Sequence, residues 1–185
     1  MLLKTRSRVV LTTRRVTGRD GLIPSQYASL HKDVRPGERI LLDDGKLELK
    51  VLSVQGRDIE CRVVFGGRLG ERKGINLPDS GVSAPSLTDA DRRDVRFALE
   101  QGVDLVALSF VRSAGDVQAL KRYMKRCGGE LPVIAKIEKP QALDDIDSIL
   151  AESHAIMVAR GDLGIEIDPA RVPMVQKELI DKARV

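Results

Sequence analysis

The segment IMVARGDLGIEID, residues 156–168, decides how the second half of this sequence is interpreted. Its apolar beginning is typical of a buried strand, and the run ends abruptly in Arg160, Gly161 and Asp162. A strand with such an end delivers a guanidinium group and a carboxylate to one place, and glycine lets another group approach the backbone closely. The segment therefore predicts a buried strand with a polar site at its carboxyl end.

Strands and helices alternate around this segment, over residues 87–185. The expected strands have the sequences DLVALSFV (104–111), LPVIAKIEK (131–139) and AIMVARGD (155–162). Thr88 and Gly102 are the expected start and stop of the first helix, and Asp168 is the expected cap of the last one. Apolar strands that alternate with helices indicate an α/β domain with a parallel sheet covered by helices.

Residues 1–86 have a different pattern, in which short alternating runs are separated by glycine-containing turns. The clearest runs are RVVLTT (8–13), KLELKVLSV (46–54) and DIECRVVF (58–65). The second run changes phase at Leu52, as a β-bulge would cause. Several short strands with such turns predict a small antiparallel β-barrel or sandwich.

The composition restricts the class of protein. The chain has 185 residues, 42% of them hydrophobic, with no signal peptide and no apolar run long enough to span a membrane. Cys61 and Cys127 match no metal or redox spacing, so two reduced thiols in a cytoplasmic protein are expected. Residues 1–40 carry nine Lys and Arg against three Asp and Glu, but aromatic residues make up only 3% of the chain. We therefore expect a solvated basic face first, a phosphate-attracting surface second and a nucleic-acid site last.

Polar side chains gather at the carboxyl end of each expected strand, where parallel α/β folds place their active sites. Lys136 and Glu138 share one face of the second strand, and Arg160 and Asp162 share one face of the third. Ser109 lies near the end of the first strand and is a candidate for contact with a substrate. The pattern predicts that these side chains meet at one edge of the sheet.

The two carboxylates suggest a metal site. Adjacent strands lie about 4.8 Å apart, so Glu138 and Asp162 could share one Mg²⁺ or Mn²⁺ and leave positions for water and substrate oxygens. Lys136 would add a positive charge where negative charge builds up, and the N–H groups of Gly161 and Asp162 could hold an anion. The alternative is two ion pairs, Lys136 with Asp162 and Arg160 with Glu138. For any single residue of this set an ion pair is the better explanation, whereas the whole set on matching faces of two successive strands favours a functional site.

Longer stretches resemble a known family. VIAKIEKPQAL (133–143) and IMVARGDLGIEI (156–167) closely resemble two signature segments of pyruvate kinase. Further segments resemble that family in the same order, namely ILLDDGKLELKV (40–51), KGINLP (73–78) and VDLVALSFVR (103–112). The resemblance implies an α/β fold, with a partial TIM-type (β/α)₈ barrel over residues 87–185 and a small antiparallel β-barrel lid domain over residues 1–86.

The resemblance also implies roles for the residues at the strand ends. Glu138 and Asp162 correspond to the Mg²⁺ ligands. Lys136 corresponds to the lysine that stabilises the transferring phosphoryl group and the enolate. The backbone of Gly161 and Asp162 corresponds to the cradle of the pyruvate carboxylate, in a corner that Arg160 helps to shape.

The reaction that the resemblance implies is the glycolytic transfer of a phosphoryl group from phosphoenolpyruvate to ADP, which gives pyruvate and ATP. Asp44 and Lys73 correspond to lid residues that face the nucleotide phosphates, and a DDG turn and a solvated lysine are the alternative explanation. Full-length family members are expected to be cytoplasmic homotetramers. K⁺ is a further expected cofactor of the family, but the residues that bind it have no counterpart in this sequence.

A complete barrel of this type has eight strands, and the sequence contains three of them. We therefore expect an internal piece of the enzyme that is inactive alone. One alternative is a Mg²⁺-dependent aldolase or lyase that acts on pyruvate enolate, against which the lid-like segments argue. Another is a non-catalytic fragment that binds anions or a protein partner.

Overall fold

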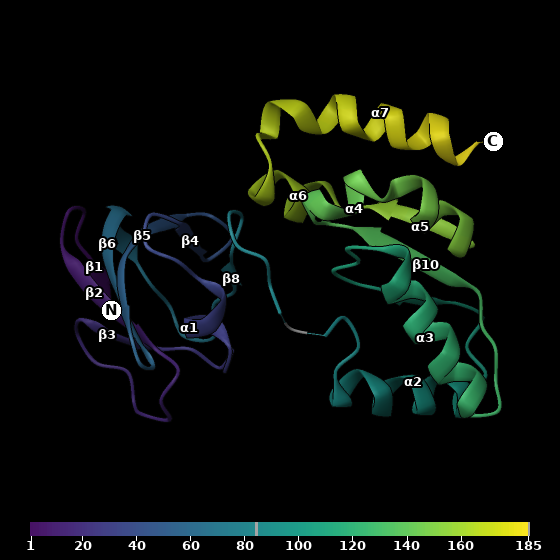
Figure 1. Cartoon of the computed structure of the whole chain (residues 1–185), viewed down its shortest axis with the longest axis horizontal. Helices are drawn as coiled ribbons and strands as arrows, with labels where there is room; N and C mark the ends of the chain where they lie inside the picture. Colours follow the sequence, from purple (N-terminus) through teal and green to yellow (C-terminus); the bar gives the residue numbers. More distant parts are fainter. Residues whose placement is uncertain (84, 185) are drawn as a thin grey trace. The chain divides into compact units, whose positions relative to one another are not determined.

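The computed structural model describes residues 1–83 and 85–184, and the chain divides into two compact units, Met1–Ala84 and Pro85–Val185 (Figure 1). Each unit has its own hydrophobic core. Among the described helices, none has the length and apolar character needed to cross a membrane.

The first unit is built mainly of strands. They are β1 (Leu2–Leu3), β2 (Arg8–Thr12), β3 (Leu22–Pro24), β4 (Arg39–Leu42), β5 (Leu47–Gln55), β6 (Asp58–Phe65), β7 (Gly67–Arg68) and β8 (Ile75–Asn76), with one short helix, α1 (Leu30–Asp33). Six of them form a sheet in the order β3-β2-β6-β5-β4-β8, while β1 pairs with β7. All pairs are antiparallel except β2 with β3, so the expected small antiparallel sheet is confirmed with one parallel pair at its edge.

Strands β5 and β6 form the long hairpin of this unit. Gly56 (φ 59°) and Arg57 connect them, and Gln55 pairs with Asp58 next to the turn. Their register shifts between Val51 and Ser53, which confirms the β-bulge predicted from the change of phase. The inward residues of β6 include Cys61, and burial raises the pKa of this thiol to about 12, so it stays protonated.

The second unit is α/β, as expected. Its elements are α2 (Asp89–Gln101), β9 (Val106–Leu108), α3 (Ala114–Arg126), β10 (Val133–Ile137), α4 (Pro140–Asp144), α5 (Ile146–Glu152), β11 (Ala155–Val158), α6 (Arg160–Glu166), the 3₁₀ turn η1 (Pro169–Arg171) and α7 (Val172–Ala183). Strand β10 lies between β9 and β11, and both pairs are parallel. All three carboxyl ends therefore meet at one edge of the sheet.

Local sequence explains most of the helix ends. Thr88 and Asp91 form a reciprocal capping box at the start of α2, and Gly102 ends that helix in the left-handed conformation (φ 67°), both as predicted. The Asp168 side chain accepts a hydrogen bond from the Ala170 N–H, but it caps the 3₁₀ turn that precedes α7. The segment after β10 forms two helices, α4 and α5, with Asp145 between them.

The prediction that the third strand runs to residue 162 is wrong. Strand β11 ends at Val158, and the Ala159 N–H then donates to the Ile137 oxygen at 3.2 Å. The Leu163 N–H already bonds to the Ala159 oxygen at 2.9 Å, which is the first bond of helix α6. Arg160 and Asp162 consequently lie in the first helical turn beyond the strand and do not share a strand face.

Candidate functional site

A buried carboxylate lies at the carboxyl edge of the parallel sheet. Glu138 follows β10 directly and is 1% exposed. Its Oε2 accepts a hydrogen bond from the Phe110 N–H at 3.0 Å, and its Oε1 lies 2.6 Å from the Lys136 Nζ. Lys136 Nζ also donates to the Ser109 Oγ at 3.0 Å. The structure thus brings together three of the residues that the sequence places at this edge.

The two oxygens of Glu138 have different surroundings. In the part of the chain that the structure describes, buried Oε1 accepts no hydrogen bond, although the Lys136 ammonium lies close enough for an ion pair. A buried carboxylate oxygen without a donor is costly unless a cation compensates it. Lys136 is that cation here, so any metal ion at Oε1 would compete with its ammonium.

Phe110 has an unusual backbone conformation beside this carboxylate. Its φ of 55° lies in the left-handed region, which a bulky side chain rarely adopts and which typically costs about 1–3 kcal/mol. The hydrogen bond from its N–H to Glu138 contributes to holding this conformation. No feature of the sequence predicts it, since a left-handed residue is normally glycine or asparagine.

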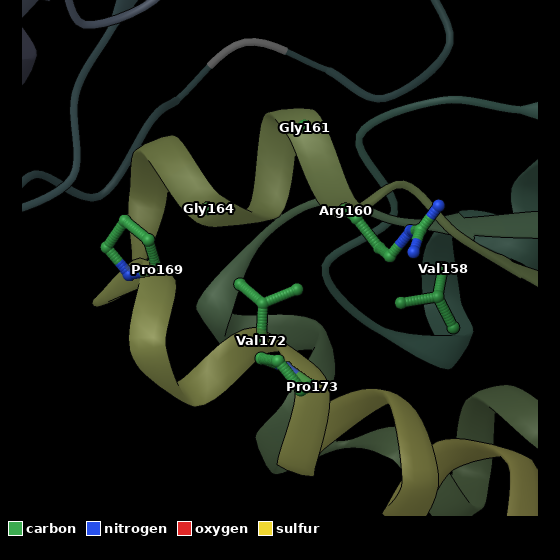
Figure 2. Close-up of a pocket in the computed structure, with 7 residues that line it drawn as sticks. All are labelled: Val158, Arg160, Gly161, Gly164, Pro169, Val172 and Pro173. Carbon is green, nitrogen blue, oxygen red and sulfur yellow. The ribbon is translucent and has the colours of Figure 1, made fainter.

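The first turn of α6 carries the other predicted residues. Arg160, Gly161 and Asp162 are exposed, and their N–H groups precede the first intrahelical bond. Arg160 and Gly161 line an open hollow of about 660 Å³ (Figure 2). The remaining lining residues are Val158, Gly164, Pro169, Val172 and Pro173. Arg160 is the charged residue among these lining residues, and the others are valines, prolines and glycines.

The shared site of Glu138 and Asp162 stays a prediction, while one of its two alternatives is excluded. The alternative ion pair of Lys136 with Asp162 is wrong, because Lys136 pairs with Glu138. Within residues 1–83 and 85–184, no group of three or more His, Cys, Asp or Glu side chains could hold a metal ion. A cation at Glu138 and Asp162 would therefore depend on water and substrate oxygens for its other ligands.

Two residues that the sequence analysis missed form a buried ion pair. Lys139 Nζ lies 2.5 Å from the Glu166 Oε1, and their side chains are 12% and 2% exposed. Lys139 follows Glu138 and precedes α4, and Glu166 is the last residue of α6. The continued alternation of β10 places Lys139 on the face of Ile137 and would have indicated its burial.

In the first unit, Lys73 is paired with Asp43. The Lys73 Nζ lies 2.9 Å from the Asp43 Oδ1, and Lys46 Nζ lies 3.4 Å from the same oxygen. Asp43 is buried, whereas Asp44 is exposed, and both have left-handed backbones with φ values of 51° and 57°. The sequence indicates Asp44 in this turn, whereas Asp43 is the aspartate that pairs with Lys73.

The Asp43 contact makes the first unit sensitive to acid. The hydrogen bond from Lys73 lowers the pKa of Asp43, so the ionised carboxylate stabilises the fold above about pH 4 and this contribution is lost as the pH falls through the lowered pKa. We expect Asp43→Asn to lower the free energy of unfolding at pH 6 and to lower it much less at pH 3. Urea unfolding followed by circular dichroism measures this, with the exposed Asp20→Asn as the control. An equal loss at both pH values would contradict the prediction.

Comparison with known proteins gives consistent results. The family model described as "Pyruvate kinase, barrel domain" matches residues 2–185. The pyruvate kinase of Corynebacterium efficiens is 47% identical over 176 residues, which are 95% of this chain and 37% of the relative. That of Thermococcus litoralis is 42% identical over 183 residues, 99% of this chain and 38% of the relative. A crystal structure of a pyruvate kinase from Cryptosporidium parvum superposes with a TM-score of 0.89 at 38% identity, and covers 98% of this chain and 38% of that one. The chain thus spans little more than a third of the relatives it matches.

Proposed function

Since this chain belongs to the pyruvate kinase family, we propose that it carries part of a site that transfers a phosphoryl group from phosphoenolpyruvate to ADP. The observation that carries the proposal is Glu138, a buried carboxylate paired with the fixed Lys136 at the carboxyl edge of a parallel sheet. The family match extends over both units, which favours this function over an aldolase or lyase.

A divalent cation fits the chemistry of Glu138. Its Oε1 is a hard anionic oxygen, as Mg²⁺ and Mn²⁺ prefer, and faces only the Lys136 ammonium among the described residues; Asp162 would supply the second carboxylate. When bound, the cation would neutralise negative charge on the phosphoryl and enolate oxygens. Glu138 is held for this task, because the Phe110 N–H fixes its other oxygen.

Lys136 supplies the fixed positive charge. The Ser109 hydroxyl and Glu138 orient its ammonium before any substrate arrives, so little reorganisation is needed as negative charge develops. Phosphoryl transfer depends mainly on such positioning and charge stabilisation. We propose that Lys136 stabilises the transferring phosphoryl group and the enolate, that Arg160 helps to shape the corner that holds the substrate carboxylate, and that Ser109 contacts the substrate.

The first turn of α6 is proposed to hold the substrate carboxylate. The N–H groups of Gly161 and Asp162 have no partner within the helix, and a Cβ built on Gly161 meets no protein atom within 4 Å. An anion can therefore approach this backbone. In the first unit we propose Lys73 and Asp44 for the nucleotide phosphates, with Asp43 holding the Lys73 ammonium.

For full-length relatives we further propose a cytoplasmic homotetramer that acts on phosphoenolpyruvate and ADP. Mg²⁺ or Mn²⁺ is the proposed metal. K⁺ is proposed for the family alone, since this chain has no residues assigned to it.

Glu138→Gln tests the proposed function. We expect Mn²⁺ affinity, measured by paramagnetic relaxation of water protons, to fall by roughly tenfold or more, because the amide keeps the shape but loses the charge. The exposed Glu130→Gln is the matched control and should leave the affinity unchanged. Equal Mn²⁺ affinity in the Glu138→Gln variant and the parent chain would contradict the proposal that Glu138 binds the metal ion.

Gly161→Ala separates ligand contact from folding. The added methyl group meets open space, and alanine is favoured over glycine in a helix by up to about 1 kcal/mol, so the stability should not fall. We expect pyruvate binding with saturating Mn²⁺, followed by NMR line broadening, to weaken by about tenfold because the methyl group blocks the backbone. Gly164→Ala in the same helix is the control, since its Cβ makes an ordinary contact of 3.5 Å with Val172. Similar binding in both variants would argue against the cradle.

A further inference from the structure

Helix α6 is attached to the end of β10 at two points. Just before the helix, the Ala159 N–H donates to the Ile137 oxygen at 3.2 Å. At its last residue, the Glu166 Oε1 lies 2.5 Å from the Lys139 Nζ. The two anchors are therefore Ile137, the last residue of β10, and Lys139, two residues beyond it, one on each side of Glu138 in the sequence.

The second attachment is almost closed to solvent. The side chains of Lys139 and Glu166 are 12% and 2% exposed, and Leu163 between the two attachment points is fully buried. Taking two charges out of water is expensive, and apolar residues of similar size would typically stabilise such a place as well or better. The stability of the fold therefore does not by itself explain why this place holds a charged pair.

A charged pair at this place is explained if it fixes the direction of helix α6. Seven residues of helix extend about 10 Å, so the position of the Glu166 end fixes the direction of the helix axis. The opposite end carries Gly161 and Asp162. Lys139 also lies 5.9 Å from the centre of the Phe110 ring, and the Phe110 N–H binds Glu138. Lys139 thus contacts both Glu166 at the end of α6 and Phe110, whose N–H binds the buried carboxylate.

We propose that Lys139 and Glu166 are positioning residues whose ion pair sets the first turn of α6 relative to Glu138. The pair touches neither the metal nor the substrate. The inference rests on the proposed function only for the ligands that Gly161, Asp162 and Glu138 hold. The placement of the helix is a separate property that can be measured without any ligand.

The test uses the ¹⁵N-labelled chain and the double variant K139M/E166M. Both replacements are unbranched and of similar length, so the variant should fold. We expect the Gly161 amide resonance to shift and the exchange of the Leu163 amide hydrogen to accelerate by about tenfold or more, while Gly128, beyond α3, keeps its resonance. The swap K139E/E166K has the same combined length with the charges exchanged, and it should restore both signals.

Each outcome has a definite meaning. An unshifted Gly161 resonance in K139M/E166M would overturn the proposal, and so would a shift that the swap variant fails to reverse. E166Q keeps the size and an oxygen acceptor, and it replaces the double variant if that variant does not fold. Mn²⁺ titration then distinguishes the two proposals. If Gly161 responds as expected but the parent chain binds no Mn²⁺, the metal site fails and the positioning role stands.

Discussion

Lys136→Met in a full-length relative with these residues is expected to lower phosphoryl transfer by roughly a hundredfold or more, because one preorganised charge is removed from the developing anion. The loss should fall on kcat more than on the KM for phosphoenolpyruvate, since the charge acts most strongly in the transition state. A coupled assay of ATP formation measures both constants. Lys125→Met, on the exposed face of α3, is the control.

The same substitution has a second effect that follows from the 2.6 Å contact with Glu138. Without Lys136 the buried carboxylate has no cation, and such a loss typically costs about 3–5 kcal/mol. We expect Mn²⁺ to restore the melting temperature of the variant and to bind at least as tightly as in the parent, because the ammonium no longer competes for Oε1. Unchanged turnover would show that Lys136 is only the ion-pair partner of Glu138.

The 185-residue chain by itself is expected to form no measurable ATP from phosphoenolpyruvate and ADP. Lys136, Glu138 and α6 all belong to one edge of a three-stranded sheet, so the reacting groups would be held from one side only. Catalysis by positioning fails when the substrate keeps its freedom on the other sides. The coupled assay should therefore remain at background where an ordinary enzyme turns over about ten times per second.

Sizing by chromatography complements this assay. Large apolar side chains of the second unit are exposed, among them Phe97 (63%), Met174 (61%), Leu105 (52%) and Met157 (45%). Strands β9 and β11 also have unpaired edges within the described sheet, and such features promote association. We expect a mixture of self-associated species. A single monomeric peak with ordinary turnover would contradict both expectations.

The sequence predicts the architecture well, because the signals for it are local. The first half of the sequence has strands of alternating apolar and polar residues, and in the second half strands alternate with helices, which identifies the β unit and the α/β unit. The Thr88 and Gly102 caps mark the ends of α2. The side-chain alternation also places Lys136 and Glu138 on one face of β10, and the structure has them in contact. These features depend on neighbouring residues and so can be predicted from a single sequence.

The parts that could not be predicted depend on distant contacts or on the path of the backbone. Lys139 and Glu166 are far apart in the sequence, and nothing local joins them. The sequence pattern predicts that the strand continues through ARGD (159–162), with Arg160 and Asp162 on one face. The chain instead turns into α6 at Arg160, so Asp162 does not lie on that strand face. Likewise, the choice between Asp43 and Asp44 depends on which carboxylate the left-handed turn buries.

The central place of β10 has a consequence for the order of folding. Both neighbours of β10 are parallel to it and are reached through helices, so neither pair can form until a long loop has closed. The β5–β6 hairpin closes through two residues and can form within microseconds. In pulse-labelled refolding, amide protection should therefore develop first at the amides bonded between β5 and β6, and last at Ala135. We therefore expect the second unit to keep its apolar strands exposed for longer and to be the part of the chain that benefits more from chaperones.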